Sequence, residues 1–151
     1  MNINKLIKDS NCLILNSKTK TESLLEIIEV IENSSQCSDV ENLKKEIFYR
    51  EQIMSTGIGQ GIGIPHVRFE GIKEPIVTIA ISPSGISDYE SIDGEIVKII
   101  VMILVGADQH KEYLRILSLL VKKIKDRAFQ KRLLECKNSS EITEVLKVED
   151  F

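Results

Sequence analysis

Tryptophan is absent from this 151-residue chain, histidine occurs twice and cysteine three times. The cysteines, Cys12, Cys37 and Cys136, are odd in number, far apart and without C-x-x-C spacing, which argues against a disulfide framework and a zinc site. We interpret them as small buried hydrophobic residues. Two histidines, His66 and His110, are too few for most metal centres or catalytic triads, so no metal is expected.

The chain also lacks a long hydrophobic run and an excess of one charge. The longest apolar run, residues 99–105, is far too short to cross a bilayer, and the N-terminus lacks the pattern of a secretory signal. Lys and Arg number 20 against 23 Asp and Glu, a net charge of −3, which argues against general binding of nucleic acids. We therefore expect a soluble, cytoplasmic protein without membrane insertion or nucleic-acid binding.

Three apolar runs predict strands, at residues 12–15, 75–81 and 96–105. The last is interrupted by Lys98 alone, as expected of a strand covered on both faces. The Ser-Pro-Ser-Gly sequence at 82–85 predicts a turn that ends the second strand, and Asp93-Gly94 predicts a turn before the third.

Capping-box patterns predict helix starts at Thr19 and at Ser38, the second helix reaching about Gln52. Further helices are expected from Asp108, from Asp126 and from a cap at Ser139 or Ser140. Apolar residues at helical spacing follow these starts: Leu24, Ile27, Ile28 and Ile31; Val40, Leu43 and Ile47; Tyr113, Leu117, Leu120 and Ile124; Phe129 and Leu133; Ile142, Val145 and Leu146. Strands alternating with amphipathic helices predict one α/β domain over residues 1–151, with helices on both faces of the sheet.

The most informative segment is STGIGQGIGIPH, residues 55–66. Glycine occupies every second position in its centre, so an extended backbone can present successive N–H groups to a closely approaching ligand. No Gly-Lys-Ser/Thr follows, and a helix rather than a strand is expected before the glycines, so neither a P-loop nor a dinucleotide site is predicted. The glycines concerned are Gly57, Gly59, Gly61 and Gly63.

His66 ends this segment, after a proline that favours an extended Ile64. A neutral imidazole is a competent nucleophile near pH 7. A phosphoryl group on it would need N–H donors and a cation. The glycine-rich backbone, Thr56, Arg50 and Arg68 are the candidates. The pattern alone leaves open the alternative of a histidine in a tight turn with no chemical role.

Other charged residues have simpler interpretations. Glu51, at the end of the helix before the glycines, opposes the helix dipole, so local compensation is expected. His110 falls in the first turn of the long helix, where an exposed polar side chain is the ordinary interpretation. Residues 111–132 contain eight Lys and Arg against two Asp and Glu, a basic solvated face that could guide an acidic partner.

Arg50-Glu51 followed by residues 55–66 resembles the signature of enzyme IIA domains of the phosphotransferase system (PTS), of the fructose/mannitol type, which includes the nitrogen-regulatory branch. The resemblance extends over nearly the whole chain. It implies a mixed, mostly parallel sheet flanked by helices, with His66 taking a phosphoryl group from phospho-HPr. That group would pass to a cysteine of an enzyme IIB or be held as a regulatory signal. By position, Arg50 matches the family's active-site arginine.

Two positions depart from the family pattern. Gly63 stands where alanine is usual, which we interpret as a mild change. Tyr113 occupies the place of the family's second histidine, and His110 lies three residues earlier. Either Tyr113 or His110 supports His66, or the site is tuned differently. A further alternative is a member of the family that has lost activity through Tyr113.

The leading hypothesis is a cytoplasmic phosphocarrier for sugar uptake, in which His66 attacks phospho-HPr. Arg50, Thr56 and the glycine amides would hold the phosphoryl oxygens, and no cofactor is expected beyond the covalent phosphoryl group. Further support is assigned to Tyr113, His110, Arg68 and Glu51. The alternative is a regulatory protein whose phosphorylation changes its affinity for a target protein. The sequence does not identify the sugar.

Overall fold

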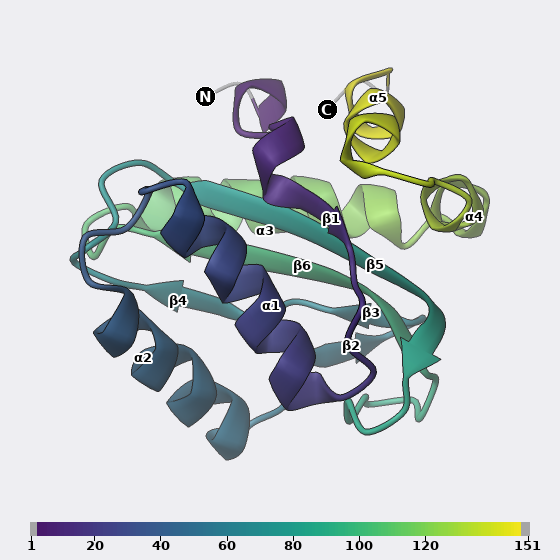
Figure 1. Cartoon of the computed structure of the whole chain (residues 1–151), viewed down its shortest axis with the longest axis horizontal. Helices are drawn as coiled ribbons and strands as arrows, with labels where there is room; N and C mark the ends of the chain where they lie inside the picture. Colours follow the sequence, from purple (N-terminus) through teal and green to yellow (C-terminus); the bar gives the residue numbers. More distant parts are fainter. Residues whose placement is uncertain (1–2, 149–151) are drawn as a thin grey trace.

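Strand β6 (Val97–Val105) lies at the centre of the sheet, and the strand that begins at His66 pairs with it in parallel. The computed structural model describes residues 3–148, and within them one six-stranded sheet has the order β1-β5-β6-β3-β2, with β4 paired to β6 (Figure 1). The other strands are β1 (Cys12–Ile14), β2 (Gly57–Gly59), β3 (Ile62–Gly63), β4 (His66–Arg68) and β5 (Ile76–Ile86).

The sheet is mixed, as predicted. Among the described strands, three of the five pairings are parallel, β1 with β5, β3 with β6 and β4 with β6. The long pairing of β5 with β6 and the β2–β3 hairpin are antiparallel. Because β3 and β4 both pair with β6, they follow one another along the same side of it, and Ile64 and Pro65 form the join between them.

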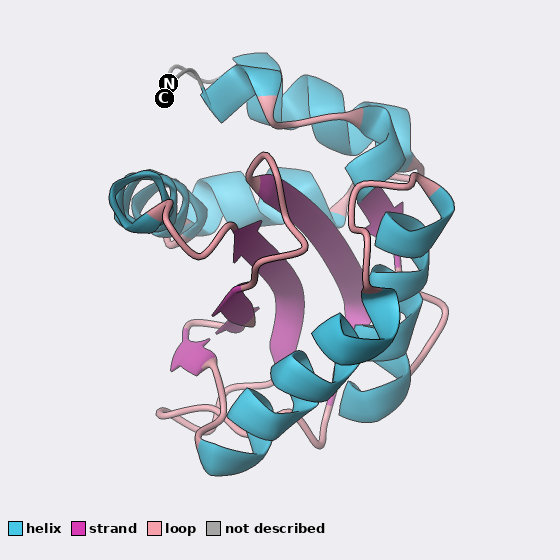
Figure 2. Ribbon diagram, turned by 90° about the vertical axis from the view of Figure 1, so that its left-hand side faces the viewer, coloured by secondary structure: helices cyan, strands magenta, loops and turns pink. Residues whose placement is uncertain are grey.

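Helices cover both faces of the sheet (Figure 2). Helices α1 and α2 pack on one face through a core that contains Leu24, Ile28 and Ile47, and α3, α4 and α5 pack on the other. The bounds are α1 (Lys20–Asn33), α2 (Val40–Ile53), α3 (His110–Ile124), α4 (Arg127–Leu134) and α5 (Ser139–Val148), with 3₁₀ turns at Ile3–Lys5 and Asp9–Asn11. Within residues 3–148, no helix is both long and apolar enough to cross a membrane.

The turn predicted at residues 82–85 is wrong, because β5 continues through this segment. The register runs from Ile81 opposite Ile99 to Ile86 opposite Val97, so five residues of β5 advance against two of β6. The extra residues of β5 form a bulge in which Gly85 has a φ of +88° and its amide donates to Ser82 Oγ. A bulge and a turn use the same residue types, which is why the sequence suggested the wrong one. Asp93-Gly94 does lie in a turn, as predicted, in which the Gly94 amide donates to the Ser91 carbonyl.

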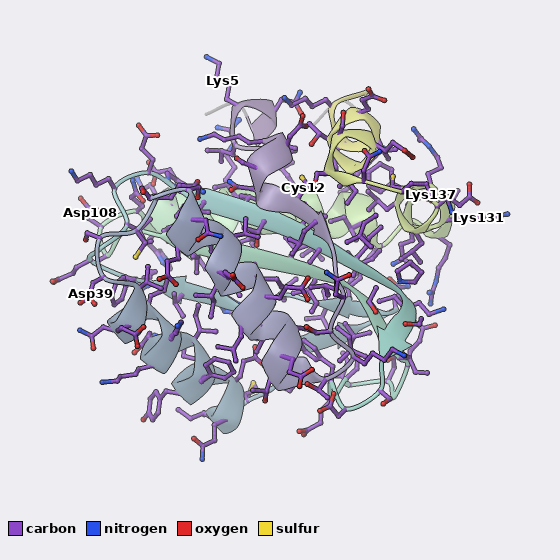
Figure 3. The ribbon with its side chains drawn as sticks, in the orientation of Figure 1. Lys5, Cys12, Asp39, Asp108, Lys131 and Lys137 are labelled. Carbon is purple, nitrogen blue, oxygen red and sulfur yellow. The ribbon has the colours of Figure 1, made fainter. Side chains whose placement is uncertain are left out.

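Side-chain caps begin the first two long helices close to the predicted positions. Thr19 Oγ1 accepts a hydrogen bond from the amide three residues later, as the capping-box pattern predicts. The second helix is capped by Asp39 instead of Ser38 (Figure 3). Aspartate and serine are nearly equal as caps, so sequence spacing could not separate two neighbouring candidates.

Two further details of the helices differ from the predictions. In α3, Ile116 is fully buried in place of Leu117, which is half-buried. At α5 the backbone amide of Glu141 donates a hydrogen bond to Asn138 Oδ1, so Asn138 is the cap in place of Ser139 or Ser140. Both differences amount to about one residue, and Leu120 and Ile124 of α3 are buried as predicted.

The cysteines are free thiols, and two of the three are buried as predicted. Cys12 and Cys136 belong to the core beneath α3, α4 and α5. Cys37 is only partly buried, beside the core beneath α1 and α2, because it lies in the segment that connects these helices.

Candidate functional site

His66 is half-buried at the first position of β4, directly after Pro65. Its Nδ1 lies 2.6 Å from the carbonyl oxygen of Ile64. Because a carbonyl oxygen only accepts, Nδ1 must carry the proton, and the neutral ring then has its free lone pair on Nε2. The local chain therefore orients the imidazole and leaves the lone pair of Nε2 free.

Tyr113, on the first turns of α3, stacks on this imidazole. The ring centroids are 5.4 Å apart and the planes differ by 27°. Desolvation raises the pKa of the Tyr113 phenol, and the positive charges of Arg50 and Arg68 oppose that rise. Both guanidinium groups are thus within electrostatic reach of the ring that covers His66.

His110 contacts Arg68 at the outer edge of the site. Arg68 Nη1 lies 3.4 Å from His110 Nδ1, and because a guanidinium only donates, this nitrogen of His110 is the acceptor. The ring of His110 is 6.3 Å from that of Tyr113 and is exposed. Of the two predicted supports, Tyr113 is therefore the one that contacts the His66 ring.

A cavity of about 590 Å³ opens beside His66. It is formed where the end of α2 meets β2 and the start of β4. Arg50 lines it and pairs with Glu46, Nε to Oε1 3.1 Å, in an exposed pair of the kind that contributes little stability. The full lining is Glu46, Tyr49, Arg50, Ile53, Met54, Ser55, Thr56, Ile58, Ile64 and His66. The structure thus brings Arg50, Thr56 and His66 to one cavity.

Glu51 is buried, with 8% of its surface exposed, and the local compensation predicted for it is present. Lys20 Nζ lies 2.9 Å from Glu51 Oε2. The backbone amide of Thr56 donates to the same oxygen, and the Thr56 hydroxyl donates to Oε1. A hydroxyl has one proton, so Thr56 in this arrangement has none to give to a phosphoryl oxygen.

The amide of Gly59, one of the glycines predicted to hold the phosphoryl group, donates to Ser91 Oγ at 3.0 Å in this structure, and its role in phosphoryl binding stays a prediction. Gly57 and Gly63 instead permit close packing: a Cβ would meet the Glu90 carbonyl oxygen at 2.1 Å and the Tyr89 ring at 2.7 Å, respectively. Gly61 has a φ of +78° in the hairpin turn. A contribution of the amides of Gly57, Gly61 and Gly63 to phosphoryl binding stays a prediction.

Sequence reasoning missed Lys20 and Tyr89 as parts of this site. Lys20 Nζ lies 4.5 Å from the centroid of the Tyr89 ring, and the Tyr89 hydroxyl is 2.6 Å from Thr56 Oγ1. No local spacing connects residues 20, 51, 56 and 89, so the sequence offered no pattern that could have joined them. The tertiary fold alone brings them together.

Comparison with known proteins identifies the family of the chain. The family model for "Phosphoenolpyruvate-dependent sugar phosphotransferase system, EIIA 2" matches residues 6–148. The PTS system fructose-specific EIIABC component of Bacillus subtilis is 30% identical over 145 residues, 96% of this chain and 23% of that protein. The fructose-specific EIIA component of Haloferax volcanii is 30% identical over 128 residues, 85% of this chain and 82% of that protein.

The fold agrees as well. The crystal structure of the nitrogen regulatory protein IIA-Ntr from Neisseria meningitidis superposes with a TM-score of 0.84 and 26% identity, covering 95% of this chain and 98% of that one. The chain spans less than a quarter of the Bacillus subtilis relative and most of the Haloferax volcanii one. The match of the family model over residues 6–148 shows that the chain belongs to the EIIA type 2 family of the phosphoenolpyruvate-dependent sugar phosphotransferase system.

Proposed function

We propose that the protein is a phosphocarrier that accepts a phosphoryl group on Nε2 of His66. The observation that carries this proposal is the hydrogen bond between His66 Nδ1 and the Ile64 carbonyl, which leaves the Nε2 lone pair free on a ring beside an open cavity. In the transfer, that lone pair attacks the phosphorus of a donor phosphohistidine. The N–P bond of the donor breaks, and its electron pair returns to the donor imidazole.

Arg50 supplies positive charge to the phosphoryl oxygens in this proposal. It lines the same cavity as His66, and its present partner, Glu46, holds it in an exposed pair. Because such a pair is weak, the guanidinium can exchange Glu46 for a dianionic phosphoryl group, which it binds in bidentate geometry. Arg68 adds charge from the side of Tyr113.

The partners proposed are an HPr-like donor and an enzyme IIB acceptor. The cavity rim exposes large apolar side chains at the end of α2: Tyr49 is 61% exposed, Ile53 65% and Met54 75%. Adaptable apolar residues around a reactive atom suit a surface that binds two proteins in turn and releases each. The name EIIABC of the Bacillus subtilis relative, which joins an A to a B component, supports the acceptor.

The phosphocarrier proposal is tested by incubating the protein with phosphoenolpyruvate, enzyme I and HPr and measuring its intact mass. The wild type and His110→Ala are expected to gain one phosphoryl group, and His66→Ala none. Failure of the wild type to gain the group, or equal gain by His66→Ala, would refute the proposal.

Regulation is the second candidate, favoured by the close superposition on a nitrogen regulatory IIA-Ntr protein. In this alternative the phosphoryl group on His66 changes the affinity for a target protein, and no transfer follows. Adding candidate enzyme IIB proteins to the phosphorylated form separates the two. A carrier loses its phosphoryl group to the IIB cysteine within seconds to minutes, whereas a regulator keeps it in the presence of every IIB of the same organism.

A further inference from the structure

A continuous chain of hydrogen bonds connects buried Glu51 to the imidazole of His66. Glu51 accepts from the amide and the hydroxyl of Thr56. The carbonyl of Thr56 accepts from the amide of Ile64 at 3.0 Å. The carbonyl of Ile64 then accepts from His66 Nδ1 at 2.6 Å. Thr56 and Ile64 thus connect the carboxylate to the ring, and each uses both its backbone N–H and its backbone C=O in the chain of hydrogen bonds.

The direction of each hydrogen bond around Glu51 is determined by chemistry. An ionised carboxylate only accepts, so the Thr56 hydroxyl donates to it and must accept from the Tyr89 hydroxyl. Burial raises the pKa of the Tyr89 phenol, and the nearby Glu51 charge raises it further, which keeps Tyr89 protonated as a donor. Tyr89 in turn packs against Gly63, next to Ile64.

Lys20 holds the other side of the carboxylate. Its Nζ lies 2.9 Å from Glu51 Oε2 and 3.2 Å from Ser55 Oγ. Three donors, one from Lys20 and two from Thr56, therefore converge on two carboxylate oxygens. The side chain of Glu51 is 5% exposed and that of Lys20 15%, so water competes little for these hydrogen bonds.

We infer that Glu51 is a positioning residue for the nucleophile: through Thr56 and Ile64 it fixes the His66 ring in the tautomer that leaves Nε2 free. The effect of Glu51 on phosphorylation rests on the proposed phosphocarrier function, whereas the chain of hydrogen bonds does not depend on it. Glu51 touches neither His66 nor the transferred group. It acts by holding the Thr56 backbone, and hence the Ile64 carbonyl, where the Nδ1 proton needs an acceptor.

Glu51→Gln is the sharpest perturbation of this chain. A glutamine amide has one acceptor oxygen and one NH₂ donor. Its NH₂ group must face either the Lys20 ammonium and the Thr56 amide, which only donate, or the Thr56 hydroxyl, which would then have to accept instead of donate. Thr56→Val removes the hydroxyl at nearly the same shape and leaves the pair of Lys20 and Glu51 intact. Thr56→Ser keeps the hydroxyl. Glu41→Gln, on an exposed part of the same helix, is the control for loss of one negative charge.

The test is nitrogen NMR of the unphosphorylated protein labelled with ¹⁵N-histidine, in which protonated and unprotonated ring nitrogens have distinct shifts. Two histidines in the chain make the assignment simple. Wild type, Thr56→Ser and Glu41→Gln are expected to show the Nδ1-protonated tautomer of His66. Glu51→Gln and Thr56→Val are expected to show a mixture of both tautomers. His110 is the internal reference.

A second readout is the rate of His66 phosphorylation against donor concentration. Glu51→Gln and Thr56→Val should lower kcat by roughly tenfold or more, with KM for the phospho-HPr donor changed less than about twofold. If both variants keep the wild-type tautomer, the inference is wrong. The tautomer is measured with no donor present, so a wild type with the expected tautomer that accepts no phosphoryl group would refute the proposed function and leave the positioning role standing.

Discussion

The phenol ring of Tyr113 lies against the imidazole of His66 at a centroid separation of 5.4 Å. Stacked aromatic pairs contribute about 0.5–1.5 kcal/mol beyond the area they bury. Tyr113 stands where the family pattern has a second histidine, and it covers one face of the His66 ring. Under the proposed function, this contact supports the nucleophile.

Tyr113→Phe keeps the stacked ring and removes the hydroxyl. We expect its phosphorylation rate to stay within about twofold of the wild type, and that of Tyr113→Ala to fall by about three- to tenfold. Because desolvation raises the pKa of the phenol, Tyr113 stays neutral up to about pH 9. The ratio of the Tyr113→Phe rate to the wild-type rate should therefore be constant from about pH 6 to pH 9. Equal losses in Tyr113→Phe and Tyr113→Ala would instead assign the role to the hydroxyl.

Gly63 is fitted to Tyr89, and the exchange of the usual alanine for glycine is therefore no mild change. A Cβ at residue 63 would lie 2.7 Å from Tyr89 Cζ and 2.8 Å from its oxygen. We expect Gly63→Ala to lower the free energy of unfolding by about 1–3 kcal/mol in urea denaturation. The same substitution in a Tyr89→Leu background should cost less, since the ring is gone. Equal costs in the two backgrounds would mean that the Tyr89 ring is not the cause of the loss.

Gln60 occupies a left-handed conformation in the hairpin between β2 and β3. Its φ is +56° and that of Gly61 is +78°, the pair of positive values that a two-residue type I′ turn requires. Asparagine tolerates this conformation better, so Gln60→Asn should raise the unfolding free energy by about 0.5–1 kcal/mol. Gln52→Asn, the same chemical change on helix α2, should lower it slightly. A loss of stability in Gln60→Asn would contradict the turn geometry.

Because the thiol of Cys12 is buried, we expect the protein to lose stability at alkaline pH. Burial raises the pKa of its thiol from 9.0 to about 11, partly offset by a hydrogen bond from Thr143. The unfolded chain releases this proton at lower pH than the folded one, so the stabilisation, roughly 2 kcal/mol, is complete below about pH 9 and is lost as pH rises through 11. Urea unfolding of the wild type and Cys12→Ala at several pH values measures it. Parallel losses in both proteins would exclude the thiol as the cause.

Local patterns in the sequence were sufficient for most of the framework. The cap at Thr19 and the buried positions Leu24 and Ile28 follow from side chains that interact within one or two turns. The run at residues 96–105 predicts a strand covered on both faces because it has almost no polar residue, and the observed strand is Val97–Val105. The motif that runs from Arg50 to His66 singled out two residues that the structure brings to one cavity, since both lie within one continuous segment.

Long-range contacts were beyond the reach of those patterns. The bulge at Gly85 depends on the register of β5 against β6, which no residue of the 82–85 segment encodes alone. The roles of Lys20 and Tyr89 arise because α1 and the loop after β5 meet at Glu51 and Thr56. The Thr56 hydroxyl is an example. The sequence predicts that it binds a phosphoryl oxygen, whereas in the structure it donates its proton to Glu51.

The atom that carries the phosphoryl group tests the account most directly. After phosphorylation of ¹⁵N-histidine-labelled protein by enzyme I and HPr, phosphorus–nitrogen coupling in NMR spectra identifies the bonded nitrogen. The hydrogen bond from His66 Nδ1 to Ile64 predicts a phosphoryl group on Nε2 of His66. Attachment at Nδ1 of His66, attachment at His110, or no attachment at all would contradict the account.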